Sequence, residues 1–226
     1  RDDSVSGQIN ALVAANVNAI FSNTPRWPAR VLEEVATIRS GVSLGRALPG
    51  ETVSLPYLRV ANVQDGRLDL REVKQVEVRP SEATKWQLQS GDLLLTEGGD
   101  WDKLGRCAIW RSEIAGCIHQ NHIFCVRVDP KVADSRYVAK VISSPLGKTY
   151  FQASAKQTTN LASINQRQLR AFPVPLPAIA EQRRIVAELN ALQTEVDALK
   201  SAHAARRADL DALLPAILDR AFAGAL

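Results

Sequence analysis

The last quarter of the chain carries the most regular hydrophobic pattern in the sequence. Between Pro177 and Phe222, apolar residues recur at alternating spacings of four and three, which is the heptad spacing of a helix that faces a partner helix. The positions on this frame are Ile185, Leu189, Leu192, Val196, Leu199, Leu210, Leu213 and Ile217. His203 and Arg206 occupy the two frame positions in its central gap. The pattern predicts a coiled-coil-forming helix over 178–223, about 65–70 Å long, with apolar ends and a polar middle.

A second amphipathic pattern covers residues 1–24. Its apolar face consists of Val5, Ile9, Leu12, Val13, Asn16, Val17 and Ile20. Ser4 is a candidate cap for the start of this helix, and the Asn23, Thr24 and Pro25 run ends it. We expect this helix to pack on the domain that follows or on the base of the long helix.

The middle of the chain alternates short strand patterns with turn signals. We predict strands at 56–63, 76–78, 92–96, 106–110 and 122–128, and helices at 31–39, 135–143 and 164–171. This mixture predicts an α+β domain with a curved or partly closed sheet. The proline-alternating segment from Pro173 to Pro177 must be extended, so it separates the domain from the long helix. The predicted domains are therefore 1–25, 26–172 and 173–226.

The net charge of +4 is concentrated in the middle block. Residues 26–175 carry 21 basic and 15 acidic residues, and the window 131–170 holds seven basic residues against Asp134 alone. A basic patch on a globular domain is typical of a nucleic-acid binder. The alternative is a solvated surface with an incidental bias, and charge alone does not separate the two.

Three polar segments of this block are candidates for DNA contact. The loop 96–106 has two adjacent glycines, with Lys103 and Arg106 as phosphate ligands; Trp101 can stack on a base, although core filling is favoured for it. Gln120 and Asn121 precede a strand, where they either pair with adenine or stabilise the turn by local hydrogen bonds. The third segment follows Lys148 and contributes Lys156, Gln157, Thr158, Thr159 and Asn160; alternatively it is a solvent loop with Asn160 or Ser163 as a helix cap.

Motifs of catalysis and metal binding are weak or absent in the sequence. Cys117, His119, His122 and Cys125 are closely spaced, but a strand would send His122 and Cys125 to opposite faces, so a zinc site is not favoured. The sequence has no Gly-x-Ser-x-Gly elbow, P-loop or dinucleotide fingerprint. We expect a non-catalytic chain without metal or cofactor. An odd set of three cysteines favours the reducing cytoplasm, and no apolar run is long enough for a membrane span.

Five segments together resemble the DNA specificity subunits of type I restriction-modification systems. They are PVPLPAIAEQRRIVAEL at 173–189, PYLRVANVQDGRLDL at 56–70, LQSGDLLLTEGGDWDKLGRCAIW at 88–110, HQNHIFCVRV at 119–128 and LLPAILDRAFAGAL at 213–226. The positions that match best are Pro175, Leu176, Pro177, Glu181, Gln182, Arg183, Arg184 and Ile185. Specificity subunits usually have two recognition domains and two long helices, whereas this sequence contains one of each. The resemblance therefore implies a half-subunit, either a fragment or a natural half that works as a pair.

The resemblance also implies a function and partners. The domain would recognise one half of a bipartite double-stranded DNA target, and the long helix would pair with a second one in a homodimer or with a paired half-subunit. Modification (methyltransferase) subunits, which use S-adenosylmethionine, and a restriction/translocase subunit would supply the catalysis. Two other classes stay open: an adaptor whose basic domain binds an acidic protein, and a free-standing enzyme that uses the loops of residues 98–122.

Overall fold

The computed structural model describes residues 2–22, 27–101, 104–157 and 162–223. The chain divides into two units, one of residues 16–186 and the other of residues 1–15 with 187–226. No helix in the described part of the chain is long and apolar enough to cross a membrane. Sequence and structure agree on the class, because the larger unit mixes helices with open sheets and a long helix follows it.

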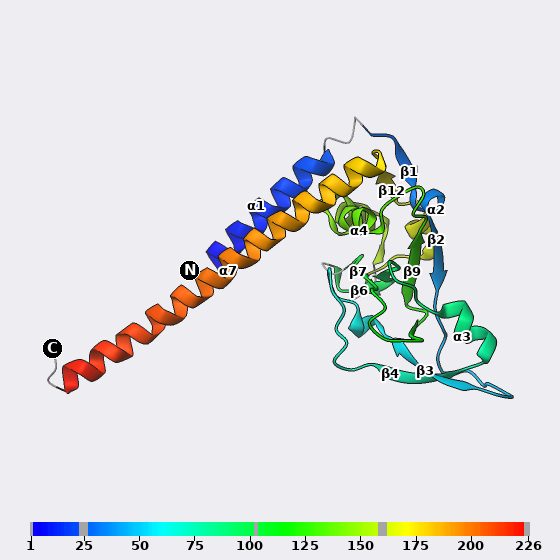
Figure 1. The fold of residues 1–226 in the computed structure, drawn as a ribbon, viewed down its shortest axis with the longest axis horizontal. Coiled ribbons are helices and arrows are strands. Elements are labelled where there is room, and N and C mark those ends of the chain that lie inside the picture. The colour runs from blue at the N-terminus through cyan, green and yellow to red at the C-terminus, as the bar shows by residue number, and fades with distance from the viewer. Residues whose placement is uncertain (1, 23–26, 102–103, 158–161, 224–226) are drawn as a thin grey trace. The chain divides into compact units, whose positions relative to one another are not determined.

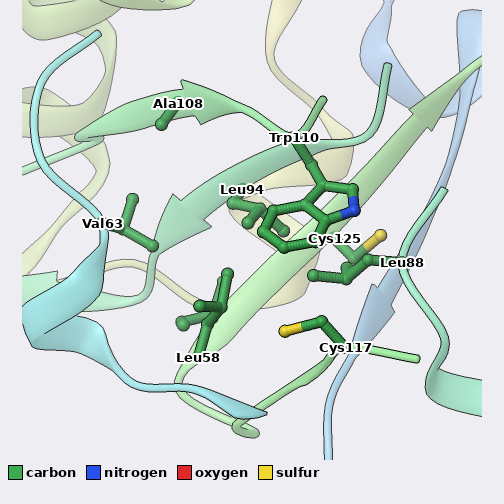
Figure 2. Packing of buried hydrophobic residues seen from close by; sticks show 9 residues of the cluster. Leu58, Val63, Leu88, Leu94, Ala108, Trp110, Cys117 and Cys125 are labelled. Atoms are coloured by element: carbon green, nitrogen blue, oxygen red, sulfur yellow. The ribbon is translucent and has the colours of Figure 1, made fainter. Parts of the chain in front are cut away.

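The larger unit is built around a four-stranded antiparallel sheet. Its order is β2 (Ala36–Ser40), β9 (Ile123–Val128), β5 (Leu93–Thr96) and β7 (Cys107–Ile109). Every residue of β5 is buried, which explains its continuous Leu-Leu-Leu-Thr run: both faces of this strand are covered. Figure 2 shows Trp110 packed among Leu58, Leu88, Leu94 and Cys117 in the main hydrophobic cluster.

A second sheet packs a smaller cluster. In it β3 (Val53–Leu58) lies between β4 (Lys74–Val78), with which it is antiparallel, and β8 (Ile118–His119), with which it is parallel. The buried members of its cluster are Val42, Tyr57, Val78 and Ile118. Helix α3 (Pro80–Trp86) contacts β3 and β8, and Trp86 packs against this cluster.

Short helices complete the larger unit. They are α2 (Leu32–Val35), the 3-10 helix η2 (Val60–Asn62), α4 (Ser135–Ser143), α5 (Pro145–Ser154) and α6 (Gln166–Arg170). The Phe151 and Phe172 rings stack at 5.1 Å between centroids, which ties α5 to the segment after α6. The Tyr137 hydroxyl of α4 donates to the Pro175 carbonyl at 2.8 Å. These contacts anchor the proline strap to the domain.

The strap is extended, as its prolines predict, and it is a strand. Residues Pro173–Pro175 form β12, which pairs antiparallel with β1 (Ala29–Val31). The long helix α7 (Ile179–Phe222) begins just after it. Gln182 is fully buried in the first turn: its Nε2 donates to the Pro177 carbonyl at 2.9 Å, and its Oε1 accepts from the Asp134 backbone N–H at 2.8 Å. These two hydrogen bonds explain why an amide side chain occupies this position in the first turn of α7.

In the smaller unit, residues 2–15 of α1 (Asp2–Ser22) run alongside α7 (Figure 1). The heptad positions Leu189 and Val196 are buried there, whereas four later ones are exposed by 43–64%: Leu199, Leu210, Leu213 and Ile217.

The prediction that the first helix packs on the domain or on the base of the long helix is confirmed in part. Leu12 is 66% exposed and does not belong to its packed face. The predicted Ser4 cap is wrong, because Ser4 already lies inside α1.

Several predicted elements of the domain need correction. The helix predicted at 31–39 is a single turn, α2, between β1 and β2, because residues 36–40 pair with β9 over their full length. The strand predicted at 56–63 covers 53–58 instead, and the chain then forms η2. Helices α3 and α5 were not predicted, since both are short and start at a proline whose preceding residue is extended.

Candidate nucleic-acid interface

A small sheet joins two loops that are far apart in the sequence. Strand β11 (Ala162–Ser163) lies between β10 (Lys156–Gln157) and β6 (Gly98–Gly99) and is antiparallel to both. A Cβ on Gly98 would lie 3.0 Å from the Ala162 carbonyl oxygen, so a glycine permits this close approach. The glycine loop and the segment around Lys156, two separate predictions from sequence, are therefore parts of one surface.

The turn of residues 120–122 adjoins the start of the same loop. The Glu97 backbone N–H donates to the His122 carbonyl at 3.0 Å, and the His122 ring nitrogen Nδ1 lies 2.6 Å from Glu97 Oε2. Backbone bonds fix the turn: the N–H of Gln120 donates to the Leu58 carbonyl, and that of Asn121 to the Val42 carbonyl, both at 2.9 Å. The two side-chain amides are half-buried at this edge. Their predicted role in reading bases stays a prediction.

Arg106 is held at the other end of the glycine loop. Gly105 has φ +70°, and a Cβ there would lie 2.5 Å from the buried Phe151 ring, so only glycine fits this backbone against α5. The Arg106 carbonyl accepts from the Thr96 N–H at 3.2 Å. Its guanidinium Nη1 donates to Gln64 Oε1 at 3.3 Å. The guanidinium is thus half-buried and oriented.

Two lysines supply exposed positive charge near these loops. Lys148 on α5 has a side chain that is 50% exposed, and its Nζ lies 3.7 Å from Asp65 Oδ2. Lys156 is exposed on β10. Arg106 and Lys148 both contact the 63–68 turn, through Gln64 and Asp65, and Lys156 lies on β10, which β11 joins to the glycine loop. We call the surface formed by the described residues of the 63–68 turn, the 97–106 loop, the 120–122 turn and the 148–163 segment the four-loop surface.

Part of the predicted contact set has a described position on this surface: Arg106, Gln120, Asn121, Lys148 and Lys156. Gln157 is placed by its backbone in β10. Lys103, Thr158, Thr159 and Asn160 lie outside the residues that the structure describes.

Two expectations at this surface change. Trp101 does not fill the core: its side chain is 41% exposed, and Trp110, 1% exposed, occupies the indole site of the main cluster. The cap of α6 is Asn165, whose side chain accepts from the Gln168 N–H, rather than Asn160 or Ser163. No local pattern in the sequence places the 63–68 turn beside Arg106, because the contacts of this turn are long-range.

The cysteines and histidines near the sheet are separated by burial. Cys117 and Cys125 lie in the main cluster, where burial raises the pKa of each thiol to about 12. His119 is 1% exposed and burial lowers its pKa to about 4, while Nδ1 donates to the Ile123 carbonyl at 3.0 Å. His122 is exposed. Among the described residues, no group of three or more His, Cys, Asp or Glu side chains is arranged to hold a metal ion.

A cavity of about 430 Å³ lies elsewhere in the larger unit, between the start of β5, the start of α4 and the first turn of α7. Its charged residues form ion pairs. Asp92 is 1% exposed and accepts from Arg127 Nε at 2.7 Å and Nη2 at 2.6 Å, and Asp134 pairs with Arg136 at 2.6 Å. The hydrogen bond from Arg136 lowers the pKa of Asp134. The first pair joins β9 to the residue before β5, and the second lies at the N-terminus of α4.

Comparison with known proteins gives consistent matches. The family model of the type I restriction modification DNA specificity domain matches residues 26–204. The chain is 25% identical to a putative type I restriction enzyme MjaX specificity subunit of Methanocaldococcus jannaschii, over 70% of this chain and 37% of the relative. It is 27% identical to the type I restriction enzyme EcoKI specificity subunit of Escherichia coli, over 84% of this chain and 40% of the relative.

Solved structures share the fold. The HsdS subunit of Thermoanaerobacter tengcongensis matches 99% of this chain with 53% of its own, at a TM-score of 0.64 and 23% identity. A chain from a study of the assembly and conformational transition of the type I restriction-modification system matches 99% of this chain with 54% of its own, at a TM-score of 0.72 and 24% identity. The sequence thus spans about 40% of the curated relatives and about half of the matched structures.

Proposed function

Because this chain belongs to the family of type I restriction-modification DNA specificity domains, we propose that it recognises double-stranded DNA by sequence and is itself non-catalytic. The observation that carries this proposal is the four-loop surface, where β6, β11 and β10 bring the glycine loop and Lys156 together. Phosphate contacts would supply most of the affinity, and base contacts the discrimination.

The role of each predicted contact follows from its chemistry. The proposed phosphate ligands are Arg106, Lys148, Lys156 and Lys103. The oriented guanidinium of Arg106 can alternatively bind the edge of a guanine. Gln120 and Asn121 present amides that suit adenine, and the segment of Gln157, Thr158, Thr159 and Asn160 is proposed to contact base edges or phosphate. The buried thiols and the buried His119 are poor nucleophiles and bases at neutral pH, which supports a binding role for the chain.

The long helix is proposed to fix the distance between two recognition domains. Its 44 residues span about 66 Å at 1.5 Å per residue. Exposed leucines on the second half of its heptad frame suit a second long helix, supplied by a second copy of this chain or by a paired half-subunit. Each domain would then read one half of a bipartite target. This proposal is supported by the chain's share of its relatives, which is well below their full length.

Catalysis is assigned to partner subunits. Modification (methyltransferase) subunits would dock on the outer surface of α7 and use S-adenosylmethionine, and a restriction/translocase subunit would cleave DNA. The three cysteines are free and buried, which suits a reducing compartment, so we place the protein in the cytoplasm.

The proposal is tested with this chain reconstituted with modification subunits. A randomised duplex library should yield an enriched sequence, and binding should weaken steeply between about 50 and 200 mM salt. Replacing residues 26–172 by another recognition domain should change the enriched sequence. A footprint without sequence preference, or an unchanged target after the swap, would refute recognition by this domain. Salt-insensitive binding to an acidic protein with no DNA retention would favour an adaptor.

A further inference from the structure

The turn of residues 63–68 is fixed against the sheet. Val63, fully buried, forms an antiparallel bridge with Leu68, and Gly66 has φ +73°. The Gly66 N–H donates to the carbonyl of Cys107, the first residue of β7, at 2.9 Å. The Gln64 N–H donates to the Arg67 carbonyl at 3.0 Å. Two polar residues of the turn, Gln64 and Asp65, are therefore presented from a backbone that hydrogen bonds hold in place.

Gln64 is bonded through both ends of its amide. Its Nε2 donates to the Ala61 carbonyl at 2.8 Å, which orients Oε1 toward the Arg106 guanidinium, 3.3 Å from Nη1. An arginine can only donate and a carbonyl can only accept, so the opposite amide orientation would lose both bonds. Gln64 thus restricts the orientation of the Arg106 guanidinium at the end of the glycine loop.

Asp65 faces the other cation of this region. Its carboxylate is 53% exposed, and the Lys148 ammonium, 3.7 Å away, is 50% exposed. Such exposed pairs are weak, so a DNA phosphate can displace the carboxylate. The same carboxylate repels phosphate and partly neutralises Lys148 before DNA arrives. The turn therefore opposes phosphate binding at Lys148 while it orients Arg106.

We infer that the 63–68 turn is a working part of the DNA interface, in which Gln64 is a positioning residue for Arg106 and Asp65 competes with phosphate for Lys148. This inference rests on the proposed function, and it assigns separate effects to two neighbouring residues. Gln64 acts on sequence discrimination, since it aims a side chain. Asp65 acts on affinity for any duplex, since it changes only the charge that phosphate meets.

The Asp65→Asn variant tests the effect of Asp65 on affinity in the reconstituted complex. Affinities are measured by fluorescence anisotropy for the enriched duplex and for the randomised duplex, over a series of salt concentrations. Both should bind about two- to five-fold more tightly, and the ratio of the two affinities should stay unchanged. The slope of log K against log salt should steepen by up to about 0.9, the contribution of one added phosphate contact. Glu51→Gln is the control, because it makes the same charge change at an exposed residue ahead of β3.

Two substitutions of Gln64 test its effect on sequence discrimination. Gln64→Met keeps the length but removes the acceptor, so the ratio of specific to non-specific affinity should fall about five-fold or more while the salt slope stays constant. Gln64→Glu keeps an acceptor for Arg106 but loses the donor to the Ala61 carbonyl, so the ratio should fall less than in Gln64→Met, while both affinities fall. A purely structural role of Gln64 predicts instead equal losses on both duplexes and a lower free energy of unfolding, which urea titration of each variant measures.

The outcomes separate the two levels of proposal. If the wild-type complex enriches no sequence, the proposed function fails, and this inference fails with it. If the wild-type complex enriches a sequence but Asp65→Asn behaves like Glu51→Gln and Gln64→Met keeps the wild-type ratio, only the role of the turn is overturned.

Discussion

Substitution of Gly105 by alanine should destabilise the protein through one identifiable contact. The backbone at Gly105 has φ +70°, which costs an alanine about 1–2 kcal/mol. The added Cβ would also lie 2.5 Å from Phe151 Cδ2 and 2.9 Å from Cε2. Phe151 is fully buried and stacked on Phe172, so its ring has little room to move. Overpacking of this kind costs about 1–3 kcal/mol, so we expect a total loss of about 2–5 kcal/mol.

Gly45 provides a matched control, because its φ is +72° and nothing lies within 4 Å of an added Cβ. Gly45→Ala should therefore cost only the backbone strain, about 1–2 kcal/mol, less the gain from a stiffer unfolded chain. Urea unfolding followed by circular dichroism measures both variants. The difference between them, about 1–3 kcal/mol, isolates the clash with the ring.

A double variant checks the cause. Phe151→Leu removes part of the ring that meets the new Cβ, so it should cost less in the Gly105→Ala background than in the wild type. Equal stability of Gly105→Ala and Gly45→Ala, within about 0.5 kcal/mol, would refute the contact as the reason for glycine. A coupling of zero between Gly105→Ala and Phe151→Leu would do the same.

Three further outcomes are expected. Asp92→Leu should lower the free energy of unfolding by about 2–3 kcal/mol, which is low for a buried ion pair because the Arg127 side chain is 28% exposed. Adding Arg127→Met should recover most of this loss in urea titrations. A double variant as unstable as the single one would contradict this explanation. The pKa of His119 is lowered to about 4, below the usual 6.5, so protonation of His119 favours the unfolded chain. The free energy of unfolding should therefore fall by about 2 kcal/mol between pH 7 and pH 5. If it falls by the same amount in His119→Gln, other groups cause the pH dependence. Replacing His203 and Arg206 together by leucine should raise the melting temperature and broaden the oligomeric state, if the polar layer sets the register of helix pairing; a lower melting temperature with an unchanged dimer in light scattering would exclude that role.

The long helix shows how far a periodic pattern leads. Its spacing predicts a helix over 178–223, and α7 covers Ile179–Phe222, because every turn of such a helix repeats the same local preference. The frame alone does not say which of its apolar residues are covered. Leu189 and Val196 are buried in the unit that includes residues 2–15 of α1, whereas Leu210 is 64% exposed. Which heptad positions are covered therefore depends on how far α1 extends along α7.

The region after residue 30 shows the opposite case. Residues 31–39 have an apolar spacing that suits a helix, yet residues 36–40 form β2, because pairing with β9 satisfies five residues of backbone at once. Strand β5 was predicted correctly because its continuous apolar run fits a strand buried on both faces. Local propensity is thus overruled where a long-range ladder is available.

The sequence by itself determined the α+β class, the extended proline strap, the long helix and the basic character of the middle block, since each depends on residues that are close in the chain. It also singled out Arg106, Gln120, Lys148 and Lys156 one at a time. Only the tertiary structure decided that β11 joins the glycine loop to Lys156, and that the 63–68 turn meets Arg106 and Lys148. The physical reason is that these contacts join residues tens of positions apart, and no local pattern encodes which loops a folded sheet brings together.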